Sequence, residues 1–162
     1  MKNLKPTLKH GGSIMIWGCI SAAGVGEMTR IEGIMKKEDY LHILKQHLHK
    51  SAEKLGIRDT FKFYQDNDPK RKFHIVKAWL LYKCPKVLET PPQSHDLNPI
   101  ENLWAQLKSR TWKTLSKSKV ELEEKIKKEW GKITSEDINK YISNMPQRLR
   151  EVIRRRWYPA SY

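Results

Sequence analysis

The chain has 162 residues, of which 38% are hydrophobic and six are tryptophan, and this is enough apolar material for one domain with a real core. Its 32 basic and 18 acidic residues give a formal net charge of +14 at pH 7, and such a positive surface most commonly binds a phosphate backbone, with a membrane surface as the rival partner. No run approaches the 18 apolar residues of a membrane-spanning helix, and Cys19 and Cys84 form neither a zinc-binding spacing nor a disulfide framework, so we expect a soluble, non-secreted protein with reduced thiols.

The first part of the chain predicts a β-hairpin that follows a basic tail. Residues 1–10 are basic, contain a proline and show no periodicity, so we interpret them as a tail or the remnant of a linker. Ser13–Ser21 is apolar on both alternating faces, which is typical of an inner strand covered on both sides. A turn at Ala22–Gly26 leads to Glu27–Glu32, which reads as a second and more polar strand.

The middle of the chain alternates helices with short strands. Lys37–Leu55 carries apolar residues on one face, with Gly56 just past its end, and predicts a helix. Phe61–Tyr64 is a short aromatic run of strand type, Arg71–Tyr82 has helical periodicity, and Val87–Glu89 predicts another short strand.

The last part of the chain is expected to be helical. A proline-rich loop over residues 90–98 precedes three predicted helices. Ser118 and Glu121 form a capping box ahead of the second helix. The third begins near Ser135, and Pro146 is expected to kink or interrupt it. The resulting order, ββ-α-β-α-β-α-α-α, belongs to the α/β class.

Two acidic residues stand at the ends of predicted elements. Asp66 follows the aromatic strand, and Glu101 lies in the first turn of the helix that begins after Asn98 and Pro99. Open α/β sheets place their catalytic groups at this kind of edge, and a pair of carboxylates held there can bind a divalent metal that supports phosphodiester cleavage. Simpler roles stay open: Asp66 bonding its own turn, and Glu101 capping the Asn98 N–H.

The basic residues fall into two groups that are candidates for binding a nucleic acid. The alternatives are a solvated helix start for the first group and favourable placement near a helix C-terminus for the second. The first group is Lys70, Arg71 and Lys72, and the second is Arg148, Arg150, Arg154, Arg155 and Arg156.

Three strings of residues resemble the catalytic domain of the mariner superfamily of cut-and-paste DNA transposases. They are QDNDPK at residues 65–70, DLNPIENLW at residues 96–104 and GGSIMIWGC at residues 11–19. The resemblance implies an RNase H-like mixed sheet flanked by helices over residues 11–162, two Mg²⁺ or Mn²⁺ ions, and a D-D-E triad that cleaves DNA ends and joins them to a target. Asp66 matches the second aspartate and Glu101 the glutamate, and the 34 residues between them are the family's spacing.

The chain departs from the family at its N-terminal end. Met1–Gly26 contains no acidic residue, so the family's first aspartate and the central strand that carries it are expected to be missing, as is the upstream DNA-binding region. The domain is therefore predicted to be incomplete at its N-terminus. Three interpretations stay open: a metal-dependent transposase domain, a catalytically inactive DNA-binding remnant, and a polypeptide whose open strand edges prevent stable folding alone. The resemblance also implies DNA as partner and a nuclear location, with no membrane association, and leaves a homodimer open.

Overall fold

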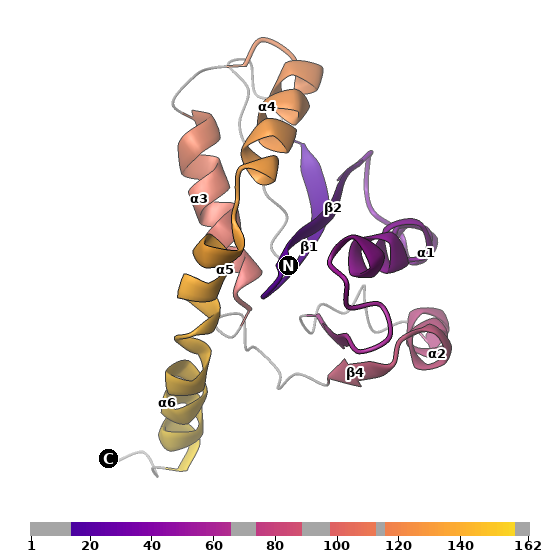
Figure 1. Ribbon diagram of the computed structural model, residues 1–162. Helices are drawn as coiled ribbons and strands as arrows, with labels where there is room; N and C mark the ends of the chain where they lie inside the picture. Colours follow the sequence, from indigo (N-terminus) through magenta and orange to yellow (C-terminus); the bar gives the residue numbers. More distant parts are fainter. Residues whose placement is uncertain (1–13, 66–73, 89–97, 113–115, 158–162) are drawn as a thin grey trace, which may run out of the picture.

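The structure is a computed structural model that describes residues 14–65, 74–88, 98–112 and 116–157 (Figure 1). The described residues form a mixed α/β fold in which helices flank two small sheets. In chain order the elements are β1 (Met15–Ser21), β2 (Gly24–Ile31), α1 (Lys37–Lys54), β3 (Lys62–Tyr64), α2 (His74–Lys83), β4 (Lys86–Leu88), α3 (Ile100–Trp112), α4 (Lys119–Gly131), α5 (Ser135–Ile142) and α6 (Met145–Trp157).

The predicted hairpin is confirmed, with a shorter turn than expected. β1 and β2 pair antiparallel, and the pairing closes with Ser21 opposite Gly24. Gly26, which was predicted to be part of the turn, lies within β2. A β carbon at Gly26 would lie 2.6 Å from Cys19 Sγ and 2.7 Å from Ser51 Cβ. Glycine is therefore needed here because the hairpin packs closely on α1, and not because the chain turns.

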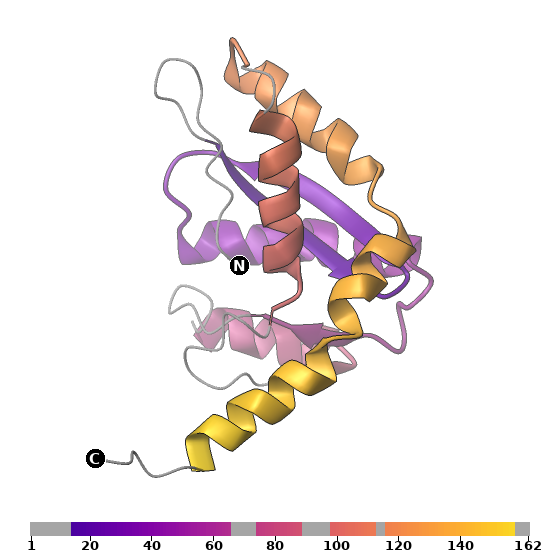
Figure 2. The same cartoon turned by 90° about the vertical axis from the view of Figure 1, so that its left-hand side faces the viewer.

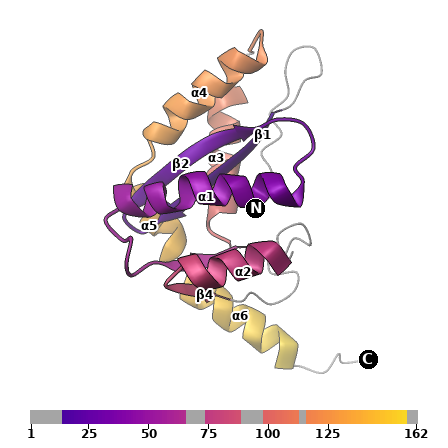
Figure 3. The same ribbon diagram turned by 90° about the vertical axis from the view of Figure 1, so that its right-hand side faces the viewer.

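The second sheet is parallel and separate from the hairpin. β3 pairs with β4 in the register Lys62 opposite Lys86 and Tyr64 opposite Leu88. Among the described residues no strand joins β1 to β3, and the strands form two two-stranded sheets. Viewed from the side of α1, that helix crosses the hairpin while α2 lies beside β4 (Figure 3).

The hairpin separates two hydrophobic cores. Alternating residues of β1 point to opposite faces, so Trp17 packs with α1, α2 and β3, whereas Ile16 packs with α3, α4 and α5. Figure 1 shows α1 on one side of the hairpin and α3 and α4 on the other. This sandwich explains why the sequence of β1 is apolar at consecutive positions.

The chain closes with four helices where three were predicted. The third predicted helix is divided into α5 and α6, and the break falls at residues 143–144, just before Pro146 (Figure 2). Proline is tolerated as the second residue of α6 because the first N–H groups of a helix have no intrahelical partner. The break therefore precedes the proline, and the proline then starts a new helix.

The predicted capping box of α4 is half correct. Ser118 Oγ accepts a hydrogen bond from the Glu121 N–H at 3.1 Å, as expected. Glu121 Oε2, however, accepts from the Lys117 N–H at 2.7 Å and not from that of Ser118. The Glu121 carboxylate thus accepts from the backbone N–H one residue before the expected one, and this N–H also lies ahead of the helix.

None of the helices that the structure describes is long and apolar enough to cross a membrane.

Candidate active site

The first part of the candidate site is the end of β3. Gln65 follows the strand, and its Oε1 accepts a hydrogen bond of 2.7 Å from the Tyr40 hydroxyl. Tyr40 is fully buried on α1, so this contact ties the end of β3 to the core. Burial also raises the pKa of Tyr64, which keeps that phenol neutral over the working pH range. The residue after this anchored strand end is Asp66.

Several predicted site residues lie outside the described part of the chain. They include Asp66 itself and the first basic group, Lys70, Arg71 and Lys72. Their roles therefore stay predictions. The observed end of β3 at Tyr64, two residues before Asp66, is consistent with them.

The second part of the site is the start of α3. Asn98 is buried, and its Oδ1 lies 3.4 Å from the Ile100 N–H, while its carbonyl accepts from the Glu101 N–H at 3.1 Å. Asn98 thus begins the helix, as predicted from the sequence. Glu101 is half-buried in the first turn, where the positive end of the helix dipole favours a carboxylate.

Tryptophan packing fixes the position of α3. Trp104 stacks on Trp130 of α4 with ring centroids 5.1 Å apart and an interplanar angle of 18°. Trp130 Nε1 in turn donates a 3.0 Å hydrogen bond to the Gly26 carbonyl in β2. Since Trp104 stands three residues after Glu101 on the same helix, the hairpin and α4 together hold the first turn of α3 in place.

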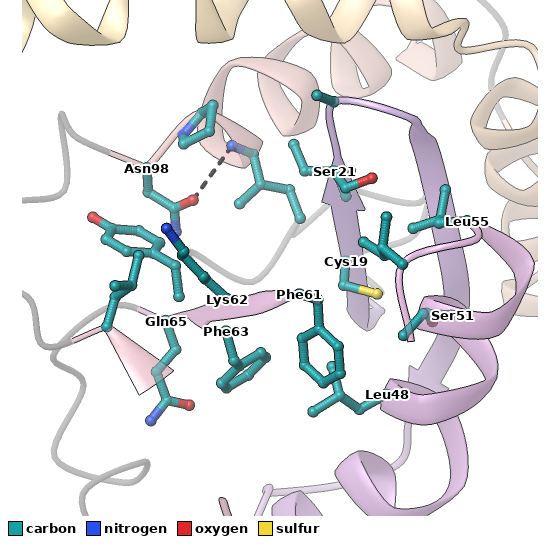
Figure 4. Close-up of a pocket in the computed structure, with 18 of the residues that line it drawn as sticks. Cys19, Ser21, Leu48, Ser51, Leu55, Phe61, Lys62, Phe63, Gln65 and Asn98 are labelled. Carbon is teal, nitrogen blue, oxygen red and sulfur yellow. Dashed lines mark hydrogen bonds between the residues drawn. The ribbon is translucent and has the colours of Figure 1, made fainter. Parts of the chain in front are cut away.

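One cavity brings the two motifs together (Figure 4). Its volume is about 850 Å³, and its lining includes Tyr64 and Gln65 from the end of β3 as well as Asn98, Pro99 and Ile100 from the start of α3. The strand end that leads to Asp66 and the helix turn that contains Glu101 therefore border the same space. The sequence predicts that Asp66 and Glu101 themselves lie close together, and because Asp66 is outside the described residues this stays a prediction.

The donor chemistry of the site suits a hard divalent cation. Asp66 and Glu101 both offer carboxylate oxygens, the ligands that Mg²⁺ and Mn²⁺ prefer. Within the described ranges no group of three or more histidine, cysteine, aspartate or glutamate side chains comes together. Asp66 lies outside these ranges, so the two motif carboxylates stay the metal ligands that the sequence predicts.

The basic helix α6 begins at the same cavity. Met145 and Leu149 of its first turns line the cavity, and Arg150 and Arg154, four residues apart on one helix face, are exposed. Arg148 is half-buried. The side chains of Arg155 and Arg156 lie outside the described part of the structure.

Two residues of the site were not assigned a role from the sequence. Tyr40 was recognised only as a member of the buried face of α1, because its hydrogen bond to Gln65 joins residues 25 positions apart. Lys62 lines the cavity from β3. A strand of three residues is too short for the alternation of polar and apolar residues to indicate which side chains face a site.

Comparison with known proteins decides the family. A family model described as "DDE superfamily endonuclease" matches residues 2–123. The chain belongs to this DDE family. Transposable element Tc1 transposase of Caenorhabditis elegans is 35% identical over 158 residues, which cover 97% of this chain and 58% of that protein. Transposable element Tcb1 transposase of Caenorhabditis briggsae is 34% identical with the same coverage.

Both relatives are transposases, in agreement with the resemblance to the mariner superfamily of transposases in the three sequence strings. The chain spans a little over half of the length of these relatives, 58% in both cases.

Solved structures show the same fold. The catalytic domain of Mos1 transposase, solved with Raltegravir and Mg, matches with a TM-score of 0.83 at 16% identity, covering 97% of this chain and 82% of that one. The corresponding structure with Mn matches with a TM-score of 0.79, also at 16% identity, covering 91% and 78%. These matches confirm the predicted RNase H-like arrangement of the α/β fold.

Proposed function

We propose that this chain supplies the Asp66 and Glu101 part of a metal-dependent site for DNA cleavage and strand transfer in cut-and-paste transposition. The observation that carries the proposal is the shared cavity, which the end of β3 and the start of α3 both border. The matches to transposases over 97% of the chain support the same conclusion.

In this proposal the chain's own residues position two metal ligands. Asp66 and Glu101 would hold Mg²⁺ or Mn²⁺, and such an ion supplies activation of the attacking oxygen and stabilisation of the leaving oxygen when bound. Tyr40 fixes the strand end ahead of Asp66 through Gln65. Asn98 fixes the helix start that carries Glu101.

DNA is the proposed partner. The exposed pair Arg150 and Arg154 lies on a helix whose first turns border the cavity, where guanidinium groups can contact phosphates beside the cleavage site. A solved structure of the Mos1 transposase paired-end complex with the left transposon end has the same fold with a TM-score of 0.77. We further propose a nuclear location and a homodimer, the latter testable by sedimentation equilibrium with and without DNA.

A second candidate function is DNA binding without cleavage. Met1–Gly26 contains no acidic residue, and the described strands leave β1 and β3 unjoined. A two-metal site that lacks one carboxylate should lose metal affinity and geometry. The chain would then be a DNA-binding remnant of a transposase domain.

Nicking of supercoiled plasmid in the presence of Mn²⁺ separates the two functions. We expect the parent to nick and both Asp66→Asn and Glu101→Gln to lose nicking. Glu38→Gln is a matched control because Glu38 is also in a helix first turn, that of α1, and is exposed. If Glu38→Gln also abolished nicking, the loss in Glu101→Gln would not be evidence that Glu101 is a metal ligand. A folded parent that never nicks would instead support the remnant.

DNA affinity as a function of salt tests the basic helix independently of cleavage. Each phosphate contact that is lost should reduce the slope of log affinity against log salt by about 1. We expect this change in Arg150→Ala and Arg154→Ala, and none in Lys127→Ala, which removes a charge that is paired with Glu123 on α4. If all three variants had the same slope as the parent, Arg150 and Arg154 would not contact the DNA backbone.

A further inference from the structure

Helix α2 is apolar on nearly all of its sides, yet the fold buries only one of them. All of its residues except His74, Lys77 and Lys83 are apolar or aromatic, and its buried residues are Val76 and Leu80. A helix that is hydrophobic all round is normally covered all round. The remaining apolar side chains of α2 therefore indicate that a second surface packs against this helix.

The exposed apolar side chains of α2 form one stripe, which we call the α2 stripe. It consists of Ile75, Ala78, Leu81 and Tyr82. With about 3.6 residues per turn, Ala78 lies opposite the buried side of the helix, and the other three surround it. Leu81 is 77% exposed and Tyr82 89% exposed, and α2 lies at the surface beside α1 (Figure 3). A small residue between larger ones leaves a hole into which a side chain of a partner helix can fit.

The α2 stripe is separate from the candidate active site. None of its four residues lines the cavity there. α2 also packs in the hydrophobic cluster on the α1 side of the hairpin, whereas α3, which carries Glu101, packs in the cluster on the other side. A role of the stripe therefore goes beyond the proposed DNA cleavage.

The charges around the α2 stripe are all of one sign. Residues 74–88 contain no aspartate or glutamate, and Lys77, Lys83 and Lys86 are exposed. By contrast, α4 carries glutamates that pair with lysines four residues later on the same helix. Since α2 and β4 contain no acidic residue of their own, complementary negative charge has to come from a partner.

We propose that the α2 stripe is the docking site for an acidic amphipathic helix of another protein. The partner helix lays its apolar face on Ile75, Leu81 and Tyr82, and glutamates or aspartates beside that face lie opposite Lys77 and Lys83. α2 has ten residues, so the matching segment is about three turns long. An interface of this length is smaller than those of stable complexes, and the association is therefore weak and transient.

Charge and burial disfavour the other occupants. A second copy that packs through the same stripe brings lysines against lysines, which repel each other. DNA phosphates match the lysines but leave the exposed apolar side chains uncovered. A helix that lies in a membrane surface inserts its broad apolar face into the lipid, whereas Val76 and Leu80 on the corresponding face of α2 are buried in the core.

Fluorescence anisotropy with a labelled synthetic helix tests the docking site. The probe is a capped peptide of about 18 residues, long enough to form a helix, with leucines on one face and glutamates and alanines elsewhere. One control peptide has the same composition in a shuffled order that has no apolar face, and the other carries lysine in place of glutamate. We expect the 162-residue chain to bind the probe with a Kd in the micromolar range, and each control about tenfold more weakly or less.

Two equally exposed residues provide a matched pair of protein variants. Leu81 belongs to the stripe and is 77% exposed, whereas Ile34 lies between β2 and α1 and is 80% exposed. Leu81→Ser should weaken probe binding about tenfold, because the partner no longer buries this side chain, and Ile34→Ser should leave binding unchanged. Both variants should keep the Tm of the parent, since neither side chain is packed in the core.

Charge reversal separates recognition at the stripe from attraction by the net charge. Each replacement of lysine by glutamate removes two positive charges, so the double variant Lys77→Glu and Lys83→Glu changes the formal net charge from +14 to +10. We expect this variant to prefer the lysine peptide to the probe, although the chain as a whole stays positive. The control Lys119→Glu and Lys128→Glu on α4 has the same net charge and should keep the preference of the parent.

Several results would overturn the proposal. They are no binding of the probe, equal binding of the probe and the shuffled peptide, and equal effects of Leu81→Ser and Ile34→Ser. Self-association in sedimentation that Leu81→Ser abolishes would instead assign the stripe to a second copy. Binding to phosphatidylserine-containing vesicles that the same substitution abolishes would assign it to a membrane. Since no DNA or metal is present, these outcomes are independent of whether the chain cleaves DNA.

Discussion

Gly18→Ala is the substitution that tests most directly how the hairpin positions the helix carrying Glu101. A β carbon at residue 18 would lie 3.1 Å from Trp104 Cη2 and 3.2 Å from Trp130 Cη2. Neither ring can yield easily, because the two rings stack on each other and Trp130 Nε1 is hydrogen-bonded to the Gly26 carbonyl. The added methyl group must therefore push α3 and α4 away from the sheet.

The expected loss of stability follows from two opposing effects. Overpacking a close-packed core destabilises by about 1–3 kcal/mol, and replacing glycine recovers about 0.4–1 kcal/mol through the unfolded chain. We expect a net loss of about 1–2 kcal/mol, which corresponds to a Tm lowered by about 2–8 °C for a chain of this size. Urea unfolding followed by tryptophan fluorescence and far-ultraviolet circular dichroism measures it.

Gly131→Ala is the matched control. Gly131 ends α4, and no heavy atom lies within 4 Å of the position of its added β carbon, so we expect unchanged or slightly increased stability. In a Trp104→Phe background the loss caused by Gly18→Ala should be smaller, because one of the contacting ring atoms is gone. Equal stability of the Gly18 and Gly131 variants would refute the packing argument.

Three further substitutions test separate contacts. Tyr40→Phe removes the hydrogen bond to Gln65 and should lower the free energy of unfolding by about 1 kcal/mol in urea titrations; no change would mean that the bond does not hold the strand end. Ser118→Ala removes the cap that accepts from the Glu121 N–H and should lower it by about 1 kcal/mol, with a Tm unchanged from the parent as the contrary result. Burial lowers the pKa of His47 below 6.5 in the folded chain, so the unfolded chain binds its proton first as the pH falls. Stability should therefore decline below about pH 6.5, and less so in His47→Gln; identical Tm profiles against pH would contradict this.

Elements with strong periodicity were predictable from the sequence. The helix expected over Lys37–Leu55 is observed over Lys37–Lys54, because its apolar face and the glycine that follows specify both the helix and its end. Gly56 indeed adopts the left-handed conformation expected there, with φ of 67°. Asp66 and Glu101 were singled out by their places at a strand end and a helix start together with the resemblance to transposases, and their shared role stays a prediction.

Long-range contacts set the features that were not predictable. The hairpin turn was predicted too long because Gly26 looked like a turn residue, whereas a glycine is required at residue 26 by the close approach of Ser51 on α1. Ser51 is itself buried, and its Oγ accepts from the Glu27 N–H at 2.8 Å and donates to the His47 carbonyl at 2.7 Å. No local pattern shows that a serine within an apolar face serves a strand 24 residues away.

The alternation of β1 between two cores has a consequence for how the molecule unfolds. Ile16 and Trp17 are neighbours in sequence, and each is 1% exposed, yet they belong to different hydrophobic clusters. If either cluster opens fully, β1 loses the packing of Ile16 or of Trp17. Because both residues are on the same strand, the other cluster is disturbed as well. We therefore expect the helices on the two sides of the hairpin to unfold as a single cooperative unit, and the amides that link β1 to β2 should exchange only when the whole fold opens.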